Sequence, residues 1–332
     1  MKCNPININI EITSDCSLNC KYCYNHWKVA NKGYYSNSYK RAYRLLKHLF
    51  KSSDVDTITF TGGEPFLSER FEEIVLYTRL KNKKVNIITN GNSSTDKQLE
   101  RLIKMGVQLF ELPFHSKRPD VHDSMTSVKG SWQKSLDSIV SIMQNKGYVV
   151  PVIVITKLNF LYIEETIEFL HDLGLRRIMV NRFNIGGNGI KAKNELLITT
   201  KDLRETFTKI NLLALKFELI VSSNVCTPFC LLNPKDYPNI EFGSCPSNVF
   251  YRPLTIDIEG NLRLCNHSPV IAGNIFKEDM NDILNSEYVA KWTDLKPSYC
   301  AECDKFEVCL GGCRAASEQM NQTLSDVDPI LQ

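Results

Sequence analysis

Residues 6–23 read ININIEITSDCSLNCKYC, and this segment decides the fold of the first part of the chain. Isoleucine alternates with polar residues through its first seven positions, which is the period of a β-strand with one buried face. Three cysteines, Cys16, Cys20 and Cys23, follow at once in a CxxxCxxC pattern. A chemically unusual loop directly after a strand is typical of α/β proteins, whose active sites lie at the carboxyl ends of the strands.

Short apolar runs alternate with amphipathic helical patterns from this segment to about residue 217. The predicted strands are residues 6–12, 55–61, 84–89, 107–113, 148–156 and 176–182. The predicted helices are residues 38–50, 68–80, 131–146, 162–173 and 200–217, with one more between Thr95, which opens a capping box with Gln98, and Gly106. Six strand–helix units indicate a parallel sheet but are too few for a closed eight-stranded barrel. The sequence therefore predicts a partial (β/α)6 TIM-like barrel over residues 1–217.

Two more loops are expected beside the cysteine loop. Gly62-Gly63-Glu64-Pro65 follows the second predicted strand, and Asn90-Gly91 follows the third. Because the carboxyl ends of parallel strands meet at one rim, these loops should converge there. Each pattern taken alone is also compatible with an ordinary turn.

Three thiolates on one short loop can bind three irons of a [4Fe–4S] cluster and leave the fourth iron open. Most electron-transfer clusters have four protein thiolates, so an open iron indicates a place for a substrate or cofactor. A zinc knuckle is the alternative. Zinc prefers paired cysteines and four ligands, and His26 is the one residue nearby that could complete such a set.

These residues resemble the signature of the radical S-adenosylmethionine (SAM) superfamily. CxxxCxxC with an aromatic residue, Tyr22, before its last cysteine is similar to that family's cluster-binding loop, and Gly-Gly-Glu-Pro after the second strand is similar to its SAM-binding motif. The resemblance implies that Cys16, Cys20 and Cys23 hold a [4Fe–4S] cluster. It also implies that the enzyme cleaves SAM reductively to a 5′-deoxyadenosyl radical, which abstracts hydrogen from a substrate.

The same resemblance implies a SAM site at the rim. Gly62, Gly63, Glu64 and Pro65 would bind the SAM amino group, and Asn90 would lie near SAM. The fourth strand departs from the family, since Leu112-Pro113-Phe114-His115-Ser116 stands where many relatives have Ser-Leu-Asp-Gly, although His122-Asp123 matches. Ser116 or His115 is the candidate for the ribose contact. Asn181 and Arg182 could meet adenine or substrate, or simply end the sixth strand.

The pattern changes after residue 217, and eight of the 12 cysteines lie between 226 and 313. Residues 255–258 and 261–265 resemble a hairpin that turns at Glu259-Gly260. Zinc is again an alternative for the pair Cys300 and Cys303. The whole array, with Gly311-Gly312-Cys313-Arg314, resembles the SPASM extension of radical SAM enzymes, which carries auxiliary [4Fe–4S] clusters. Residues 218–332 are therefore the predicted SPASM-type domain.

The resemblance implies two auxiliary clusters, and so three [4Fe–4S] clusters with SAM in all. Auxiliary cluster I would use Cys245, Cys265, Cys313 and either Cys226 or Cys230. Auxiliary cluster II would use Cys300, Cys303 and Cys309. Its fourth ligand is open: the spare upstream cysteine, Asp326 or Asp328, or none. A loop around Pro228 could direct Cys226 and Cys230 to different clusters. Cys3 is expected to be a plain thiol.

Composition and motifs narrow the function. A net charge of +3, the lack of a long apolar run and the lack of a signal peptide predict a cytoplasmic protein with no nucleic-acid or membrane partner. SPASM-type relatives mostly modify peptides, so modification of a ribosomally synthesised peptide by crosslinking, excision or oxidation is expected. The expected partners are a one-electron reductant such as flavodoxin or ferredoxin and a separate leader-peptide-binding protein, because only 15 residues precede Cys16.

Several alternatives stay open. A small-molecule radical SAM dehydrogenase of antibiotic or cofactor biosynthesis fits the same residues. A non-enzymatic iron–sulfur protein would have no use for the Gly-Gly-Glu-Pro site. Asn266-His267 stands where sulfatase-maturing relatives place an aspartate, which weakens that possibility. His267 itself is a catalytic candidate or a hydrogen-bonded structural histidine.

Overall fold

The computed structural model describes residues 7–28, 38–246 and 252–332. Cys3 and Ile6 lie outside the described residues. The six predicted strands are present as β1 (Asn7–Thr13), β2 (Thr57–Gly62), β3 (Lys84–Ile88), β4 (Leu109–Pro113), β5 (Val149–Ile155) and β6 (Arg177–Arg182). The six predicted helices are α1 (Tyr39–Ser52), α2 (Phe71–Leu80), α3 (Asp96–Lys104), α5 (Ser131–Gln144), α6 (Ile163–Asp172) and α9 (Thr200–Lys216). Shorter helices α4 (Pro119–Thr126), α7 (Asn188–Lys191) and α8 (Lys193–Leu196) lie in the loops after β4 and β6.

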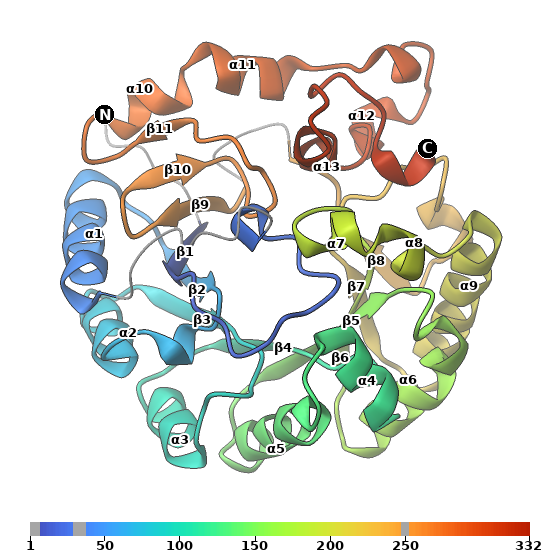
Figure 1. Ribbon diagram of the computed structural model, residues 1–332, viewed down its shortest axis with the longest axis horizontal. Helices are drawn as coiled ribbons and strands as arrows, with labels where there is room; N and C mark the ends of the chain where they lie inside the picture. Colours follow the sequence, from blue (N-terminus) through green and yellow to red (C-terminus); the bar gives the residue numbers. More distant parts are fainter. Residues whose placement is uncertain (1–6, 29–37, 247–251) are drawn as a thin grey trace.

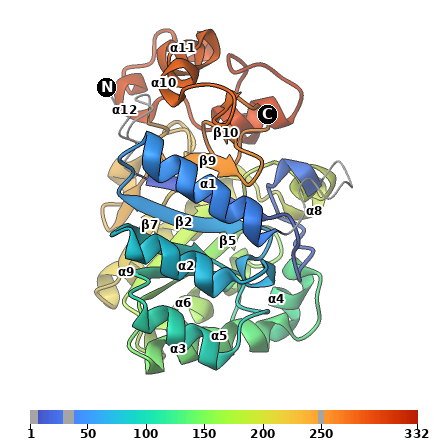
Figure 2. The ribbon, with the colours of Figure 1, turned by 90° about the vertical axis from the view of Figure 1, so that its left-hand side faces the viewer.

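The strands form a curved, mostly parallel sheet with the helices outside it (Figure 1). Strands β1 to β6 pair in sequence order, each parallel to the next. Figure 2 shows helices α1, α2, α3 and α5 along the outer wall. The predicted partial (β/α)6 TIM-like architecture is confirmed.

Element ends differ from the prediction for identifiable local reasons. The helix expected to begin at Ser68 begins at Phe71, because Pro65–Leu67 forms a separate 3-10 turn capped by the Glu64 side chain. The predicted capping box is confirmed. The Thr95 hydroxyl accepts a hydrogen bond from the Gln98 amide (3.3 Å), and the Gln98 side chain accepts one from the Thr95 amide (3.0 Å).

The two faces of the sheet carry different side chains. On β1 the isoleucines Ile8, Ile10 and Ile12 are completely buried and belong to the hydrophobic core. The alternate residues are polar, among them Asn9 and Glu11, and face the other side of the sheet. The barrel therefore has a hydrophobic outer face, which packs against its helices, and a polar inner face.

The C-terminal third extends both edges of this sheet. Its strands are β7 (Ile220–Ser223), β8 (Ile240–Phe242), β9 (Leu254–Asp257), β10 (Asn261–Arg263) and β11 (Gly273–Asn274), and its helices are α10 (Met280–Leu284), α11 (Glu287–Asp294), α12 (Phe306–Cys309) and α13 (Arg314–Gln319). The full strand order is β11-β10-β9-β1-β2-β3-β4-β5-β6-β7-β8. The antiparallel β9–β10 hairpin confirms the hairpin expected from the sequence. The sheet thus continues across residue 217, and the domain boundary there stays a prediction.

Two buried ion pairs join the C-terminal third to the barrel strands. Glu11 on β1 pairs with Arg263 on β10, and both side chains are 2% exposed. Arg182 at the end of β6 pairs with Asp328 near the C-terminus at 2.6 Å, and both are 1% exposed. In each pair one charge comes from a barrel strand and the other from the C-terminal third, so separating the two parts would remove this compensation.

No helix in residues 7–28, 38–246 and 252–332 is long and apolar enough to cross a membrane.

The Glu11–Arg263 pair gives a stability prediction. Glu11→Gln leaves the Arg263 guanidinium buried beside a neutral group, so the free energy of unfolding should fall by about 3–5 kcal/mol. Asp56→Asn is the matched control, because Asp56 and Lys84 form a pair at 3.0 Å with both side chains about half exposed. It should cost less than about 1 kcal/mol. Anaerobic urea denaturation of the two variants checks this, and equal losses would contradict the role given to the buried pair.

Candidate cluster and cofactor sites

The cysteine loop packs directly against the loop after β2. The Gly63 amide donates to the Thr13 carbonyl at 2.7 Å, and the Glu64 amide donates to the Asp15 carbonyl at 2.6 Å. A Cβ atom at Gly63 would lie 1.9 Å from the Asp15 carbonyl oxygen, so only glycine fits there. Gly62 adopts a φ of +126°, which also favours glycine. The glycines of Gly-Gly-Glu-Pro are thus needed for this close backbone approach.

Other loops of the rim hold the cysteine loop from the opposite side. The amides of Asn19 and Lys21 donate to carbonyls at the end of α4. The Asn188 side chain donates to the Cys20 carbonyl at 3.2 Å. Burial is the main cause of the raised pKa of the Tyr22 phenol, and the charges of Cys20, Cys23 and Cys16 add to it, so the three thiols lie near this ring. The structure therefore brings Cys16, Cys20 and Cys23 together on one loop, and their ligation of an iron–sulfur cluster stays a prediction.

Glu64 is completely buried beneath this loop, and Pro65 begins the turn that follows it. Its carboxylate accepts hydrogen bonds from the Thr89 hydroxyl (2.6 Å) and the Asn90 amide (2.7 Å). Burial raises the pKa of Glu64 to about 7. A cation placed beside this carboxylate would stabilise the charged form, and the ammonium of SAM is such a cation.

Asn90 links this carboxylate to the cysteine loop. The side-chain nitrogen of Asn90 donates a hydrogen bond to the Cys16 sulfur at 3.7 Å, while its backbone N–H donates one to the Glu64 carboxylate. The structure thus brings Glu64, Asn90 and the cysteine loop into one site, as expected from their places on the rim.

The candidates after β4 lie deeper than expected. Ser116 is completely buried, and its hydroxyl accepts a hydrogen bond from the Arg118 amide at 3.1 Å. His115 is buried between Tyr22 and His122, and its Nδ1 accepts from the Val154 amide at 3.3 Å. Burial lowers the pKa of His115 well below its usual range, which keeps the ring neutral. The ribose contact by Ser116 stays a prediction.

The polar residues at the end of β6 bind protein groups. The Asn181 side chain accepts hydrogen bonds from the amides of Asn224 (2.8 Å) and Val225 (3.2 Å), which fixes the loop after β7. Arg182 lies in the buried pair with Asp328. The alternatives in which these side chains meet adenine or substrate find no support in these contacts.

A first group of four thiols lies in the C-terminal third. Cys226 and Cys245 share a hydrogen bond, and the charges of Cys313 and Cys265 add to the raised pKa of Cys226. The hydrogen bond with Cys226, together with the positive charges of Arg252 and Arg314, lowers the pKa of Cys245 to about 6. Arginine charges beside buried thiols suit the negative charge of a thiolate-ligated iron–sulfur cluster. These four cysteines are the set predicted for auxiliary cluster I, with Cys226 as its upstream member.

A second group of four thiols lies nearer the surface. Burial and the charges of Cys303, Cys309 and Cys230 raise the pKa of Cys300. Burial and the charges of Cys309 and Cys303 likewise raise the pKa of Cys230. Cys300, Cys303 and Cys309 are the three thiols expected for auxiliary cluster II, and Cys230, one of the candidates for its open fourth ligand, lies beside them. Cys226 and Cys230 thus lie in different groups. Iron ligation by each cysteine stays a prediction.

The two carboxylates considered as alternative ligands lie elsewhere. Asp326 accepts hydrogen bonds from the Thr323 amide and hydroxyl at a turn. Asp328 accepts from the Cys313 amide at 2.8 Å and pairs with Arg182, so it lies beside the first group rather than the second. Within residues 7–28, 38–246 and 252–332, neither carboxylate forms a hydrogen bond or ion pair with the second group of thiols.

His267 is 5% exposed and packs near Tyr24, with ring centroids 5.3 Å apart. Its Nε2 donates to the Ile185 carbonyl at 3.1 Å, which joins it to the segment after β6. Burial lowers the pKa of His267 to about 3, so the ring is neutral. Its Nδ1 is buried without a hydrogen-bond partner in the described part of the chain. These contacts suit a structural histidine, and its catalytic role stays a hypothesis.

One residue on the strands of the barrel was missed by sequence reasoning. Glu111 lies on the inner face of β4 and is half-buried, and burial raises its pKa. Burial is the main cause of the raised pKa of Tyr24, and the charge of Glu111 is one of several smaller causes. The alternation of β4 predicts an inward residue at this position, but no motif marks it.

The eleven cysteines in the described residues are all free thiols. Within those same residues, no group of three or more His, Cys, Asp or Glu side chains is arranged around a single metal ion. His26 lies 3.2 Å from Arg263, measured from Nδ1 to Nη1, and burial together with that arginine lowers its pKa to about 4.

Comparison with known proteins agrees with this arrangement. Residues 10–170 match the radical SAM superfamily, and residues 245–304 match the iron–sulfur cluster-binding domain called SPASM. The chain is 22% identical to the PqqA peptide cyclase of Gluconobacter oxydans over 334 residues, which cover 98% of this chain and 90% of the relative. It is 27% identical to the antilisterial bacteriocin subtilosin biosynthesis protein AlbA of Bacillus subtilis over 319 residues, which cover 93% of this chain and 67% of the relative.

Solved structures show the same fold. SuiB of Streptococcus suis bound to its precursor peptide SuiA superposes with a TM-score of 0.76 at 19% identity, covering 99% of this chain and 76% of SuiB. The enzyme anSMEcpe with bound AdoMet and a peptide gives a TM-score of 0.75 at 16% identity, covering 98% of this chain and 93% of that one. The motifs, the fold and the two domain matches lead to one assignment: the chain belongs to the radical SAM enzymes that carry a C-terminal SPASM-type iron–sulfur domain.

Proposed function

We propose that this enzyme modifies a ribosomally synthesised peptide by radical SAM chemistry, using three [4Fe–4S] clusters. The observation that carries the proposal is the convergence at one rim of three thiols, the buried Glu64 carboxylate and Asn90, together with two separate groups of four thiols. SAM, when bound to the cluster on the cysteine loop, supplies the 5′-deoxyadenosyl radical that removes a hydrogen atom from the substrate.

The residues of the chain hold and shield this chemistry. Glu64 binds the SAM ammonium, and Asn90 fixes both that carboxylate and the cysteine loop. The buried position of Glu64 strengthens its attraction for a cation, because the local dielectric is low. Packing of the loops after β4 and β6 against the cysteine loop keeps water away from the reacting atoms.

The clusters proposed at the auxiliary sites would accept an electron from the substrate. Loss of a hydrogen atom leaves the substrate with one unpaired electron, and closing a crosslink or forming a double bond then releases one electron and one proton. The four thiols of the first group, with Arg252 and Arg314 beside them, are the residues suited to hold the acceptor. This arrangement supports an oxidative modification.

The names of two similar proteins support a peptide substrate. PqqA peptide cyclase is named for a peptide substrate, and SuiB was solved with its precursor peptide. The inner face of the barrel is polar, with Glu111 half-buried on β4, and could accept backbone and side-chain groups of a peptide. A one-electron reductant such as flavodoxin or ferredoxin and a leader-binding protein complete the proposed system. The small-molecule dehydrogenase remains the competing function.

Iron content tests the cluster assignment. The anaerobically reconstituted protein should hold about twelve iron atoms per chain, from three four-iron clusters. Changing Cys16, Cys20 and Cys23 together to Ala should remove about four of them and abolish formation of 5′-deoxyadenosine. Metal analysis and chromatography of the products check both, and zinc as the main bound metal would reject the assignment.

SAM affinity should depend on the charge of Glu64. Because the unliganded carboxyl has a pKa of about 7 and the ammonium binds its charged form, affinity should fall up to about tenfold per pH unit below 7. Glu64→Gln removes a charge-assisted hydrogen bond worth about 1.5–3 kcal/mol and should flatten this dependence. Calorimetric titration of SAM under anaerobic conditions measures both effects. An unchanged affinity, or a pH dependence retained in the variant, would count against the assignment.

The two upstream cysteines should serve different clusters. Cys226→Ala should perturb auxiliary cluster I alone and Cys230→Ala auxiliary cluster II alone, because their thiols lie in separate groups. Asp326→Ala is the control and should leave both clusters unchanged, since its carboxylate binds only Thr323 among the contacts found here. Mössbauer and EPR spectra of the reconstituted variants decide this. A silent cysteine variant combined with an altered Asp326 variant would show that the carboxylate is the ligand.

A further inference from the structure

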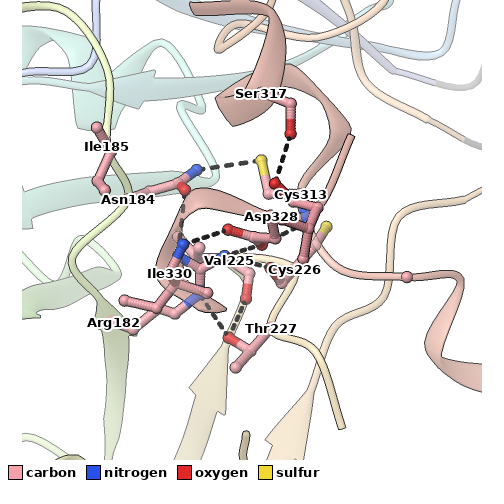
Figure 3. A network of polar contacts seen from close by, with 12 residues as sticks. Arg182, Asn184, Ile185, Val225, Cys226, Thr227, Cys313, Ser317, Asp328 and Ile330 are labelled. Atoms are coloured by element: carbon pink, nitrogen blue, oxygen red, sulfur yellow. Dashed lines mark hydrogen bonds and ion pairs between the residues drawn. The ribbon is translucent and has the colours of Figure 1, made fainter. Parts of the chain in front are cut away.

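A buried polar network surrounds two of the four thiols in the first group. Figure 3 shows Arg182 and Asn184, from the end of β6, meeting Cys226, Cys313 and Asp328 from the C-terminal third. Arg182 and Asp328 are each 1% exposed, so their charges are offset inside the protein and not by water. The network joins the barrel rim to the proposed auxiliary cluster I.

Asn184 makes the contact that reaches a sulfur atom. Its side-chain nitrogen donates a hydrogen bond to the Cys313 sulfur at 3.2 Å. Its side-chain oxygen accepts one from the Arg182 guanidinium at 3.2 Å. Because a guanidinium can only donate, Arg182 fixes which end of the Asn184 amide is the oxygen. The amide nitrogen must then face Cys313.

The other bonds of the network hold Arg182 and the cysteine backbone in place. Arg182 donates to the Cys226 carbonyl at 2.9 Å and to the Thr227 hydroxyl at 3.2 Å. Asp328 accepts from the Cys313 amide at 2.8 Å. A Cβ at Gly312 would lie 2.8 Å from the Asp328 carboxylate, so the turn before Cys313 is fitted closely to that carboxylate. One network therefore sets the positions of Cys226, Cys313 and the Asn184 amide together.

We propose that Asn184 is a positioning residue that raises the reduction potential of auxiliary cluster I through its hydrogen bond to the Cys313 thiolate, and that the Arg182–Asp328 pair holds the amide in the required orientation. Hydrogen bonds to the sulfur ligands are among the factors that set the potential of an iron–sulfur cluster. A donor stabilises the more negative, reduced cluster more than the oxidised one, so it makes the cluster a better electron acceptor. This inference rests on the proposed function.

Asn184 has a useful position for this role. It lies two residues beyond the end of β6, at the same rim as the cysteine loop, while its partner Cys313 begins α13 in the C-terminal third. A substrate radical formed at the rim would thus pass its electron toward a cluster whose potential is set by a residue of the barrel itself.

Asn184→Leu in the full-length, reconstituted protein tests the inference. Redox titration followed by EPR should show the midpoint potential of auxiliary cluster I shifted to a more negative value, with auxiliary cluster II unchanged as an internal control. The signal of cluster I is identified by its loss in Cys245→Ala. Asn184→Ala should give the same shift and serves if leucine packs badly. Asn145→Leu is the matched control, because that amide donates to the Ser141 carbonyl at the end of α5 and touches no thiol.

The outcomes separate the inference from the function on which it rests. Full iron content with an unchanged cluster I potential in both Asn184 variants would overturn the inference and leave the proposed function standing. A wild-type protein with no signal that Cys245→Ala removes would overturn the proposed auxiliary cluster, and the inference with it. A shift in Asn145→Leu as large as that in Asn184→Leu would show that the effect is not carried by the hydrogen bond to Cys313.

Discussion

The backbone contact between the cysteine loop and Gly62-Gly63-Glu64 is the constraint on which the site depends. The loop passes so close to Gly63 that no side chain fits between them. Two short amide–carbonyl hydrogen bonds hold this approach. As a result the buried Glu64 carboxylate and Asn90 lie beneath the same loop that carries the three thiols. The cluster site and the cofactor site are therefore parts of one packed unit, and a change in either backbone would displace both.

The C-terminal third extends the sheet of the barrel at both edges and also carries its own thiols. Strands β7 and β8 continue the sheet beyond β6, and β9 continues it beyond β1. Buried ion pairs then join both edges, Glu11 with Arg263 and Arg182 with Asp328. Since a buried charge without its partner is costly, these pairs make the position of the cysteine groups relative to the rim specific. The contacts that join the C-terminal third to the barrel strands thus also hold the first group of thiols beside the barrel rim.

Much of this could be predicted from the sequence because local patterns carry it. The period of two in β1, the helical periods and the capping box at Thr95 gave the six strand–helix units, and the order of parallel strands then placed three loops at one rim. The separation of Cys226 from Cys230 agrees with the loop expected around Pro228. Helix α2 begins three residues later than expected, because the Glu64 side chain caps a separate turn, which periodicity does not show.

Contacts between residues far apart in the sequence could not be predicted in this way. The carboxylate of Asp328 is chemically able to bind iron, so the sequence alone makes it an alternative cluster ligand. Only the fold shows that this carboxylate is bound by Arg182, 146 positions away, and by the Cys313 amide. Strands β7 and β8 are short and carry no clear alternation, so they are recognised only by their neighbours. Asn184 and Glu111 belong to no motif, and only the folded chain shows which groups lie beside them.

The central claim is that radical chemistry at this rim acts on a peptide. The most direct measurement is mass spectrometry of a short precursor peptide encoded beside this gene, incubated anaerobically with the reconstituted enzyme, SAM and a one-electron reductant. We predict a peptide product of lower mass, formed together with 5′-deoxyadenosine in equal amount and absent from the Cys16, Cys20 and Cys23 triple variant. Turnover of SAM that leaves every such peptide unchanged, but that oxidises a small-molecule alcohol, would contradict it.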